Sequence, residues 1–96
     1  MEPIEAVEKA LAFTDTRLAA MPSFGVYQSI HAQLNYLLGV LTGTELDRSR
    51  LKQINFGVYA AKEFEDSDPE FAQALHPAFW VATQMAKGLK VSNVPV

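Results

Sequence analysis

Apolar side chains recur along most of the chain at alternating spacings of three and four, which places them on one face of an α-helix. Four such stripes follow one another. Their members are Ile4, Val7, Leu11, Thr14 and Leu18; then Tyr27, Ile30, Leu34, Leu37 and Leu41; then Leu51, Ile54, Val58, Ala61 and Phe64; and finally Phe71, Leu75, Ala78, Ala82, Met85 and Leu89. No segment shows the period of two that is typical of a half-buried strand. The pattern therefore predicts four amphipathic helices.

Turn and capping residues separate the first three stripes. Pro3 suits the first turn of the first helix, and Pro22 ends that helix. Ser23 is expected to cap the second helix, which ends in the Thr-Gly-Thr stretch of residues 42–44. Gly57 interrupts the third stripe at a cost of about 1 kcal/mol relative to alanine. Its presence indicates close packing against another helix.

The fourth helix is expected to begin with Asp68 as its cap and Pro69 in its first turn, and to close at Gly88. Pro77 falls inside this helix. A proline there removes one backbone hydrogen bond and crowds the carbonyl four residues earlier, so we expect a kink or a break near Pro77. The tail of residues 90–96 is expected to be extended.

Short amphipathic helices joined by brief turns can cover their apolar faces only against one another. The chain has 96 residues, of which 49% are hydrophobic and 20% are charged, a composition typical of a folded globular protein. This length suits one compact core. We therefore predict an all-α fold, a small antiparallel bundle of about four helices that forms a single domain over residues 1–96.

Composition excludes several classes of function. The chain has no cysteine, which excludes disulfides, thiolate metal sites and a cysteine nucleophile and fits a reducing compartment. Its start carries acidic residues where a secretory signal needs a basic flank, and no apolar run reaches the length of a membrane span. The net charge of -3 argues against a nucleic-acid surface. We expect a cytoplasmic protein that binds neither nucleic acid nor membrane.

Residues 63–71, with the sequence EFEDSDPEF, carry five acids and no base. The five acids, here called the acidic turn, are Glu63, Glu65, Asp66, Asp68 and Glu70. So dense a group superficially resembles a calcium loop. A loop that started at Asp66 would need glycine at its sixth position and glutamate at its twelfth, where this chain has Phe71 and Pro77. We predict no bound metal and no cofactor.

Catalytic patterns are also absent from the sequence. His31 and His76 are the only histidines, and neither belongs to a motif such as HExxH. His31 borders the second stripe and is expected to be a boundary residue satisfied by hydrogen bonds, whereas His76 marks the kink before Pro77. The clustered carboxylates look uniformly solvated, unlike a catalytic pair whose pKa values are pushed apart. An acid–base enzyme or a metal-binding protein would need a site that the sequence does not show.

Charge placement gives the first hint of function. Asp68 and Glu70 suit the positive end of the fourth helix, but the other three acids lie at the C-terminal end of the third helix, where each costs roughly 0.3 to 1 kcal/mol if exposed. Only Lys62 and Arg17 are expected to offset them. Such a cluster destabilises the free protein and becomes favourable when a positively charged partner binds. A merely solvated turn is the alternative.

The opposite end of the third helix is basic. Arg48, Arg50 and Lys52 occupy its expected first turns, which is again the disfavoured sign. One explanation is that Arg48 or Arg50 reaches back to the free carbonyls that end the second helix around Thr42.

Four aromatic residues, Tyr36, Phe56, Tyr59 and Trp80, fall off the stripes. Tyrosine and tryptophan often anchor protein interfaces, although each of the four can also pack in the core. Tyr59 lies one helical turn before Glu63, so the two can share one contact patch. The predicted partner-binding residues are Tyr59, Glu63, Glu65, Asp66, Asp68, Glu70 and Trp80.

Four short motifs occur in order: LDRSRL at 46–51, KEFEDSDPEF at 62–71, AL at 74–75 and GLKV at 88–91. In these motifs the chain resembles immunity proteins of bacterial type VI secretion, specifically those paired with an effector that degrades NAD and NADP. The resemblance covers mainly the second half of the chain. It implies a small all-helical cytoplasmic protein that binds the toxin domain of its cognate effector, blocks the active site and catalyses no reaction, and so protects the producing cell and its kin.

Two further interpretations stay open on the sequence alone. A helical adaptor or regulatory subunit with no toxin partner is the alternative function. Self-association is also open, because an exposed aromatic face can serve a homo-oligomer as well as a toxin.

Overall fold

The computed structural model describes residues 1–95, and Val96, the last residue of the predicted tail, lies outside them. Three helices of 18 residues dominate: α1 (Pro3–Ala20), α2 (Gly25–Thr42) and α4 (Pro69–Ala86). Between α2 and α4 lie the 3-10 turn η1 (Leu51–Gln53), the short helix α3 (Phe56–Tyr59) and the π-helical turn η2 (Ala60–Phe64). Residues 1–95 contain no strand, and the all-α prediction is confirmed.

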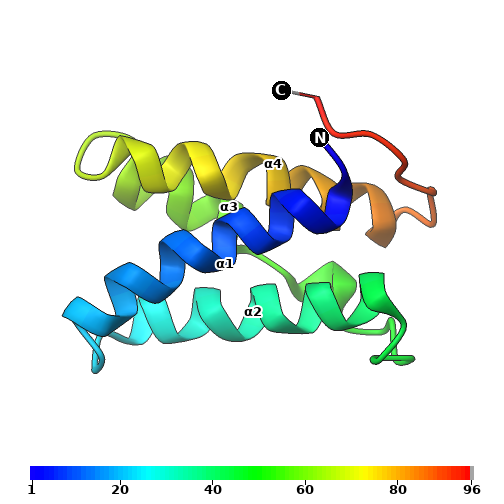
Figure 1. Ribbon diagram of the computed structural model, residues 1–96, viewed down its shortest axis with the longest axis horizontal. Helices are drawn as coiled ribbons and strands as arrows, with labels where there is room; N and C mark the ends of the chain where they lie inside the picture. Colours follow the sequence, from blue (N-terminus) through cyan, green and yellow to red (C-terminus); the bar gives the residue numbers. More distant parts are fainter. Residues whose placement is uncertain (96) are drawn as a thin grey trace.

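The long helices form an antiparallel arrangement in which α1 is central (Figure 1). α1 packs against both α2 and α4, and it runs in the opposite direction to each of them. α3, η1 and η2 pack against α4, and α3 also contacts α2. Consequently α2 and α4 run parallel to one another, and their N-terminal ends lie at the same end of the molecule (Figure 1).

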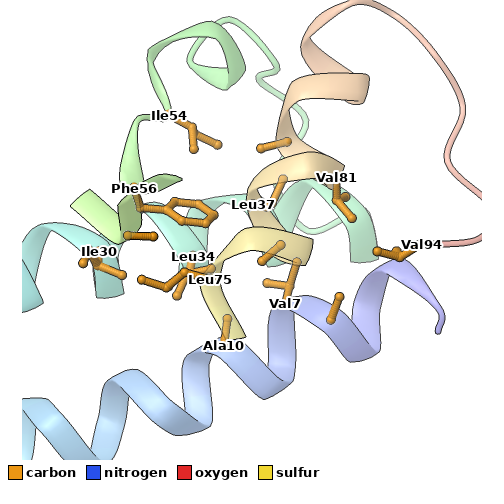
Figure 2. Packing of buried hydrophobic residues seen from close by; sticks show 14 of the residues in the cluster. Val7, Ala10, Ile30, Leu34, Leu37, Ile54, Phe56, Leu75, Val81 and Val94 are labelled. Atoms are coloured by element: carbon orange, nitrogen blue, oxygen red, sulfur yellow. The ribbon is translucent and has the colours of Figure 1, made fainter. Parts of the chain in front are cut away.

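Buried aliphatic and aromatic side chains from all of these segments meet in one core (Figure 2). The labelled members include Val7, Leu34, Leu75 and Phe56, which come from α1, α2, α4 and α3 and are all fully buried. Burying an aliphatic or aromatic side chain of this size stabilises the fold by about 1.5–3 kcal/mol. The core therefore fixes how the helices pack.

The periodic pattern is wrong about a continuous third helix. The backbone is extended at Ile54, with φ −65° and ψ 125°, and helical structure resumes only at Phe56. The interruption changes which face is buried: Val58 is 46% exposed and Ala61 is exposed, although both were expected in the core. The buried residues of this segment are Phe56, Gly57, Ala60 and Phe64.

A side chain from α2 explains the interruption. The Asn55 backbone N–H donates to Gln33 Oε1 at 2.8 Å, and Gln33 Nε2 donates to Asn55 Oδ1 at 2.8 Å. The amide of Gln33 thus serves the Asn55 N–H, which in a continuous helix would bond to a carbonyl one turn earlier. This contact joins residues 22 positions apart and gives no periodic signal in the sequence.

The other predicted helix ends have mixed outcomes. Asp68 caps α4 as expected, accepting a hydrogen bond from the Phe71 N–H at 3.4 Å. Ser23 does not cap α2. It lies in the preceding turn, where Phe24 N–H donates to the Met21 carbonyl at 3.1 Å, so that Phe24 takes the cap position.

The end of the chain also departs from the prediction in part. α4 continues through Pro77, so a break there is wrong, and a kink stays a prediction. Gly88, with φ 80°, follows the helix, so Leu89 lies beyond it and is exposed. Residues 89–95 form neither helix nor strand. This tail returns to the start of α1, where Val94 is buried and its N–H donates to the Met1 carbonyl at 2.9 Å.

The close packing expected at Gly57 is present. A Cβ atom at this position would overlap the ring of Phe79 on α4. The ring of Phe79 also meets that of Phe56 edge-on, with centroids 5.5 Å apart. Glycine at this position therefore lets α3 approach α4.

Replacing Gly57 with alanine should lower the free energy of unfolding by about 1–3 kcal/mol, because an added methyl overfills this contact. The sign is informative, since an exchange of glycine for alanine within a helix ordinarily stabilises it. Urea denaturation measures the change. Gly25→Ala is the control: nothing lies within 4 Å of a Cβ there, so stability should be unchanged or higher. Equal stability of Gly57→Ala and the parent chain would contradict the packing described.

Candidate partner-binding surface

The acidic turn connects η2 to α4 at one end of the molecule (Figure 1). Glu63 belongs to η2, Asp68 caps α4, and Glu70 lies in the first turn of α4. Four of the five acids are exposed, and Asp68 is half-buried. The structure thus gathers the predicted acids on one edge, as their closeness in sequence requires.

Arg17, on the last turn of α1, binds Asp68 with two parallel contacts. The Arg17 Nε atom lies 3.0 Å from Asp68 Oδ2, and Arg17 Nη2 lies 3.0 Å from Asp68 Oδ1. The two side chains are only 21% and 26% exposed. The hydrogen bond from Arg17 lowers the pKa of Asp68, although its partial burial opposes the shift. Asp68 therefore has a structural role within the fold, and Arg17 offsets the acidic turn as expected.

Aromatic rings support this ion pair. The Arg17 guanidinium lies over the rings of Phe13 and Phe71, 5.0 Å and 5.2 Å from their centroids. The ring centroids of Phe71 and Phe64 are 5.0 Å apart, and the ring centroid of Tyr27 on α2 lies 5.8 Å from each of them. Through these contacts the segment that carries the acidic turn packs against α1 and α2.

A second contact links the acidic turn to the middle of α4. His76 Nε2 lies 3.2 Å from Glu65 Oε1, and both side chains remain largely accessible. The sequence interpretation placed His76 only at a kink. It missed this pairing because the two residues are 11 positions apart and belong to different elements. Their adjacency follows from the reversal of the chain at the turn.

The other three acids, Glu63, Asp66 and Glu70, have no ion-pair partner among the described residues, and neither does Lys62, which was expected to offset them. The acidic turn lies near the positive ends of α2 and α4, which favour negative charge, and also near the negative ends of α1 and of the short segment η2, which oppose it. Because the positive ends of two long helices lie there and the negative end of only one, the electrostatic cost is smaller than the sequence suggested.

The basic residues do not start an α-helix, which corrects the sequence interpretation, and Lys52 lies within the 3-10 turn η1. Arg48 and Arg50 precede η1 in the loop. Arg50 lies over the ring of Tyr36, 4.3 Å from its centroid, and Nη2 is 3.6 Å from Glu45 Oε1. The end of α2 is closed instead by backbone hydrogen bonds, made possible by Gly43 at φ 85°.

The four off-stripe aromatic residues separate into two groups. Phe56 is fully buried, and Tyr36 is half-buried with its hydroxyl donating to the Asp47 carbonyl at 2.6 Å. Tyr59 and Trp80 are half-buried and pack against the core. Trp80 also lines an open groove of about 530 Å³, here called the Trp80 groove, together with Met1, Lys9, Gln73, His76, Pro77 and Pro95.

His76 lines the Trp80 groove and contacts Glu65 of the acidic turn, so the two features adjoin one another. The sequence offered one signal for the groove. Gln73, Pro77 and Trp80 are spaced by four and three, which places them on one face of α4. Lys9 and Pro95 come from distant parts of the chain and could not be assigned to it in advance.

The other predictions about chemistry can be compared with the described residues. His31 is a hydrogen-bonded boundary residue as expected, with Nε2 2.9 Å from Asp15 Oδ1 and Nδ1 3.0 Å from Asn35 Nδ2. Residues 1–95 contain no group of three or more histidine or carboxylate side chains arranged to hold a metal ion. Over the same residues, no helix has the length and apolar character needed to cross a membrane.

Comparison with known proteins gives close matches over nearly the whole chain. Residues 2–84 match the family model described as Tsi6. The chain is 43% identical over 91 residues to the immune protein Tsi6 of Pseudomonas aeruginosa strain PAO1, covering 95% of this chain and 97% of that protein.

Solved structures of Tsi6 also match this chain in sequence and in fold. A chain from the structure of Tse6 in complex with Tsi6 is 42% identical, with a TM-score of 0.87, and the match covers 94% of this chain and 96% of that one. The structure of Tsi6 from Pseudomonas aeruginosa is 43% identical, with a TM-score of 0.81, over 85% of this chain and 95% of that one.

The Arg17–Asp68 pair gives a prediction for stability. Asp68→Asn keeps an oxygen that can cap α4 but loses the ion pair, so it should cost about 1 kcal/mol. Asp68→Ala loses both and should cost about 2 kcal/mol. Because the folded-state pKa of Asp68 is lowered, the ion pair stabilises the protein above the unfolded-state pKa of about 4 and is lost as the pH falls through the folded-state pKa.

Denaturation at pH 7 and at pH values below 4 measures this effect. The difference between Asp68→Asn and the parent chain should shrink on acidification, because the parent then loses the same charge. Glu8→Gln, an exposed change on α1, is the control and should behave as the parent does at each pH. A difference that is independent of pH would show that the ion pair does not stabilise the fold.

Proposed function

The chain belongs to the Tsi6 family, and from this membership we propose that it is an immunity protein that binds and inhibits the toxin domain of a cognate type VI secretion effector. The solved relative in complex with Tse6 supports a toxin protein as its partner. The resemblance to immunity proteins paired with NAD- and NADP-degrading effectors supplies the class of toxin. The chain acts by occlusion, catalyses no reaction and works in the cytoplasm, where a toxin of this class would find its substrate.

The structural observation that supports this proposal is the acidic turn. NAD and NADP carry negative phosphates, so an enzyme that binds them needs a cleft of positive potential. Glu63, Asp66 and Glu70 are exposed carboxylates that form no ion pair within residues 1–95. Such a surface is complementary to a cleft of that kind and competes with the dinucleotide for it. No reacting group is needed for inhibition of this type.

A complex that restrains a lethal enzyme is expected to have an interface of at least standard size. To restrain a lethal enzyme at low concentration, the dissociation constant must be about nanomolar or lower, which corresponds to roughly −12 kcal/mol. A standard interface buries about 800 Å² on each partner. The chain exposes 5565 Å², so the interface takes about one seventh of its surface. Residues 1–96 form a single binding domain in this proposal, and the contact extends well beyond the acidic turn.

Purified chain added to the cognate toxin domain should abolish NAD loss at about one equivalent, because each chain blocks one active site. The measurement is the rate of NAD consumption across a titration. An unrelated NAD-consuming enzyme serves as the control and should keep its full rate, which excludes sequestration of NAD itself. Continued turnover in the presence of excess chain would reject the proposal.

A further inference from the structure

The Trp80 groove has an apolar wall that the fold leaves open. Trp80 is half-buried and packs against the core, which holds its ring in place. Met1, Pro77 and Pro95 add further apolar side chains to the lining. The volume of about 530 Å³ falls within the range of roughly 300–1,000 Å³ that is usual for ligand pockets. The groove therefore has room for an apolar side chain of a partner.

The charged groups along this groove are positive. Lys9 is exposed on α1 and lines the groove, and it belongs to none of the ion pairs found among residues 1–95. Met1 also lines the groove, and its ammonium group donates to Asn93 Oδ1 at 3.2 Å. No aspartate or glutamate is among the described residues that line it. The groove thus suits an occupant that combines apolar surface with a negative charge.

Two acids near the groove determine where a negative group can bind. Glu65 lies 3.2 Å from His76, at the side of the groove that adjoins the acidic turn. Glu5 lies one helical turn before Lys9 on α1, a spacing at which opposite charges attract, but the described structure has no ion pair between them. Lys9 therefore remains available to a partner, and a bound carboxylate is expected beside Lys9 and away from His76.

We propose that the Trp80 groove binds an acidic segment of the toxin domain, in which an apolar side chain packs on Trp80 and a neighbouring carboxylate pairs with Lys9. Gln73 is exposed on α4 and lines the same groove, and its side-chain NH₂ group can donate to that carboxylate. This inference rests on the proposed function. The toxin then presents a positive cleft to the acidic turn and an acidic segment to the groove beside it, which fixes the orientation of the complex.

Lys9→Glu identifies the occupant by the sign of its effect. Calorimetric titration with the cognate toxin domain should show binding at least about tenfold weaker than for the parent chain, because two carboxylates then face each other. Lys52→Glu is the matched control, since Lys52 is exposed in η1, forms no ion pair within residues 1–95 and does not line the groove. Added negative charge at this remote position should leave affinity unchanged or slightly higher, because the acidic turn binds a positive cleft.

Trp80 provides a direct readout of the groove, since it is the only tryptophan in the chain. Fluorotryptophan labelling gives a single fluorine NMR signal, which should shift when unlabelled toxin domain is added to the labelled chain. In Trp80→Leu the groove keeps an apolar wall but loses most of the ring surface, and affinity should fall by about tenfold. Thermal denaturation of each variant verifies that the fold is kept.

Neutral variants of the toxin domain locate the carboxylate. Each exposed aspartate or glutamate of the toxin is replaced with its amide and titrated against the parent chain and against Lys9→Met. At one acidic position of the toxin, the loss of affinity should be smaller with Lys9→Met than with the parent chain, which shows that the two groups interact. Additive effects at every position would overturn the pairing with Lys9.

The other outcomes separate the possible failures. Tighter binding of Lys9→Glu would mean a cationic occupant, and unchanged binding together with weaker binding of Trp80→Leu would mean a neutral apolar one. Either result overturns the acidic segment. An unshifted fluorine signal in a tight complex would exclude the groove from the interface, and a signal that shifts on dilution of the chain alone would assign the groove to a second copy. If the parent chain neither binds nor inhibits the toxin domain, the proposed function itself is wrong.

Discussion

The contact on which the position of the acidic turn depends is the double interaction between Arg17 and Asp68. It joins the end of α1 to the residue that caps α4, and the two phenylalanine rings beside the guanidinium keep it partly shielded from water. A bidentate pair in such a place is stronger and more directional than an exposed ion pair. It fixes the position of the acidic turn relative to the core.

The same contact determines which acids are available to a partner. Asp68 is used within the fold, as cap and as ion-pair partner, and Glu65 is next to His76. The acids without an ion-pair partner are Glu63, Asp66 and Glu70. They lie around a turn that is fixed by the Arg17–Asp68 pair and by the packed aromatic rings. A preorganised surface loses less conformational entropy on binding than a mobile one. The rigid support under the acidic turn is therefore relevant to affinity as well as to stability.

The two ends of the molecule differ in the charged residues that they carry. The acidic turn lies at one end of a bundle 33 Å long. The basic residues Arg48, Arg50, Lys52, Lys87 and Lys90 belong to segments at the other end, beyond α2 and α4 (Figure 1). They lie near the C-terminal ends of these two helices, where the helix dipoles favour positive charge. Glu2, Glu5 and Glu8 of α1 and Glu45 and Asp47 of the loop belong to the same end and offset this positive charge, so the acidic turn is where charge of one sign is concentrated.

The sequence predicted what depends on local periodicity and missed what depends on distant side chains. The three long helices follow from their apolar stripes, and Asp68 and Pro69 marked the start of α4 correctly. The prediction of a continuous third helix was wrong because the side-chain amide of Gln33 forms hydrogen bonds with Asn55, and this contact joins separate elements. For the candidate surface, the acids were visible as a cluster. The sequence did not show which acids have partners within the fold, because Arg17 and His76 reach them only through the tertiary arrangement. The groove lined by Lys9, Pro95 and Trp80 also depends on that arrangement.

The central claim is that the acidic turn contacts the toxin. Its most direct test is the association of the cognate toxin domain with Asp66→Lys compared with Glu8→Lys, two exposed positions that receive the same change of charge. The account predicts that Asp66→Lys slows association and weakens binding by at least about tenfold, while Glu8→Lys, on the first half of α1, binds almost as the parent chain does. Equal binding by the two variants would contradict it.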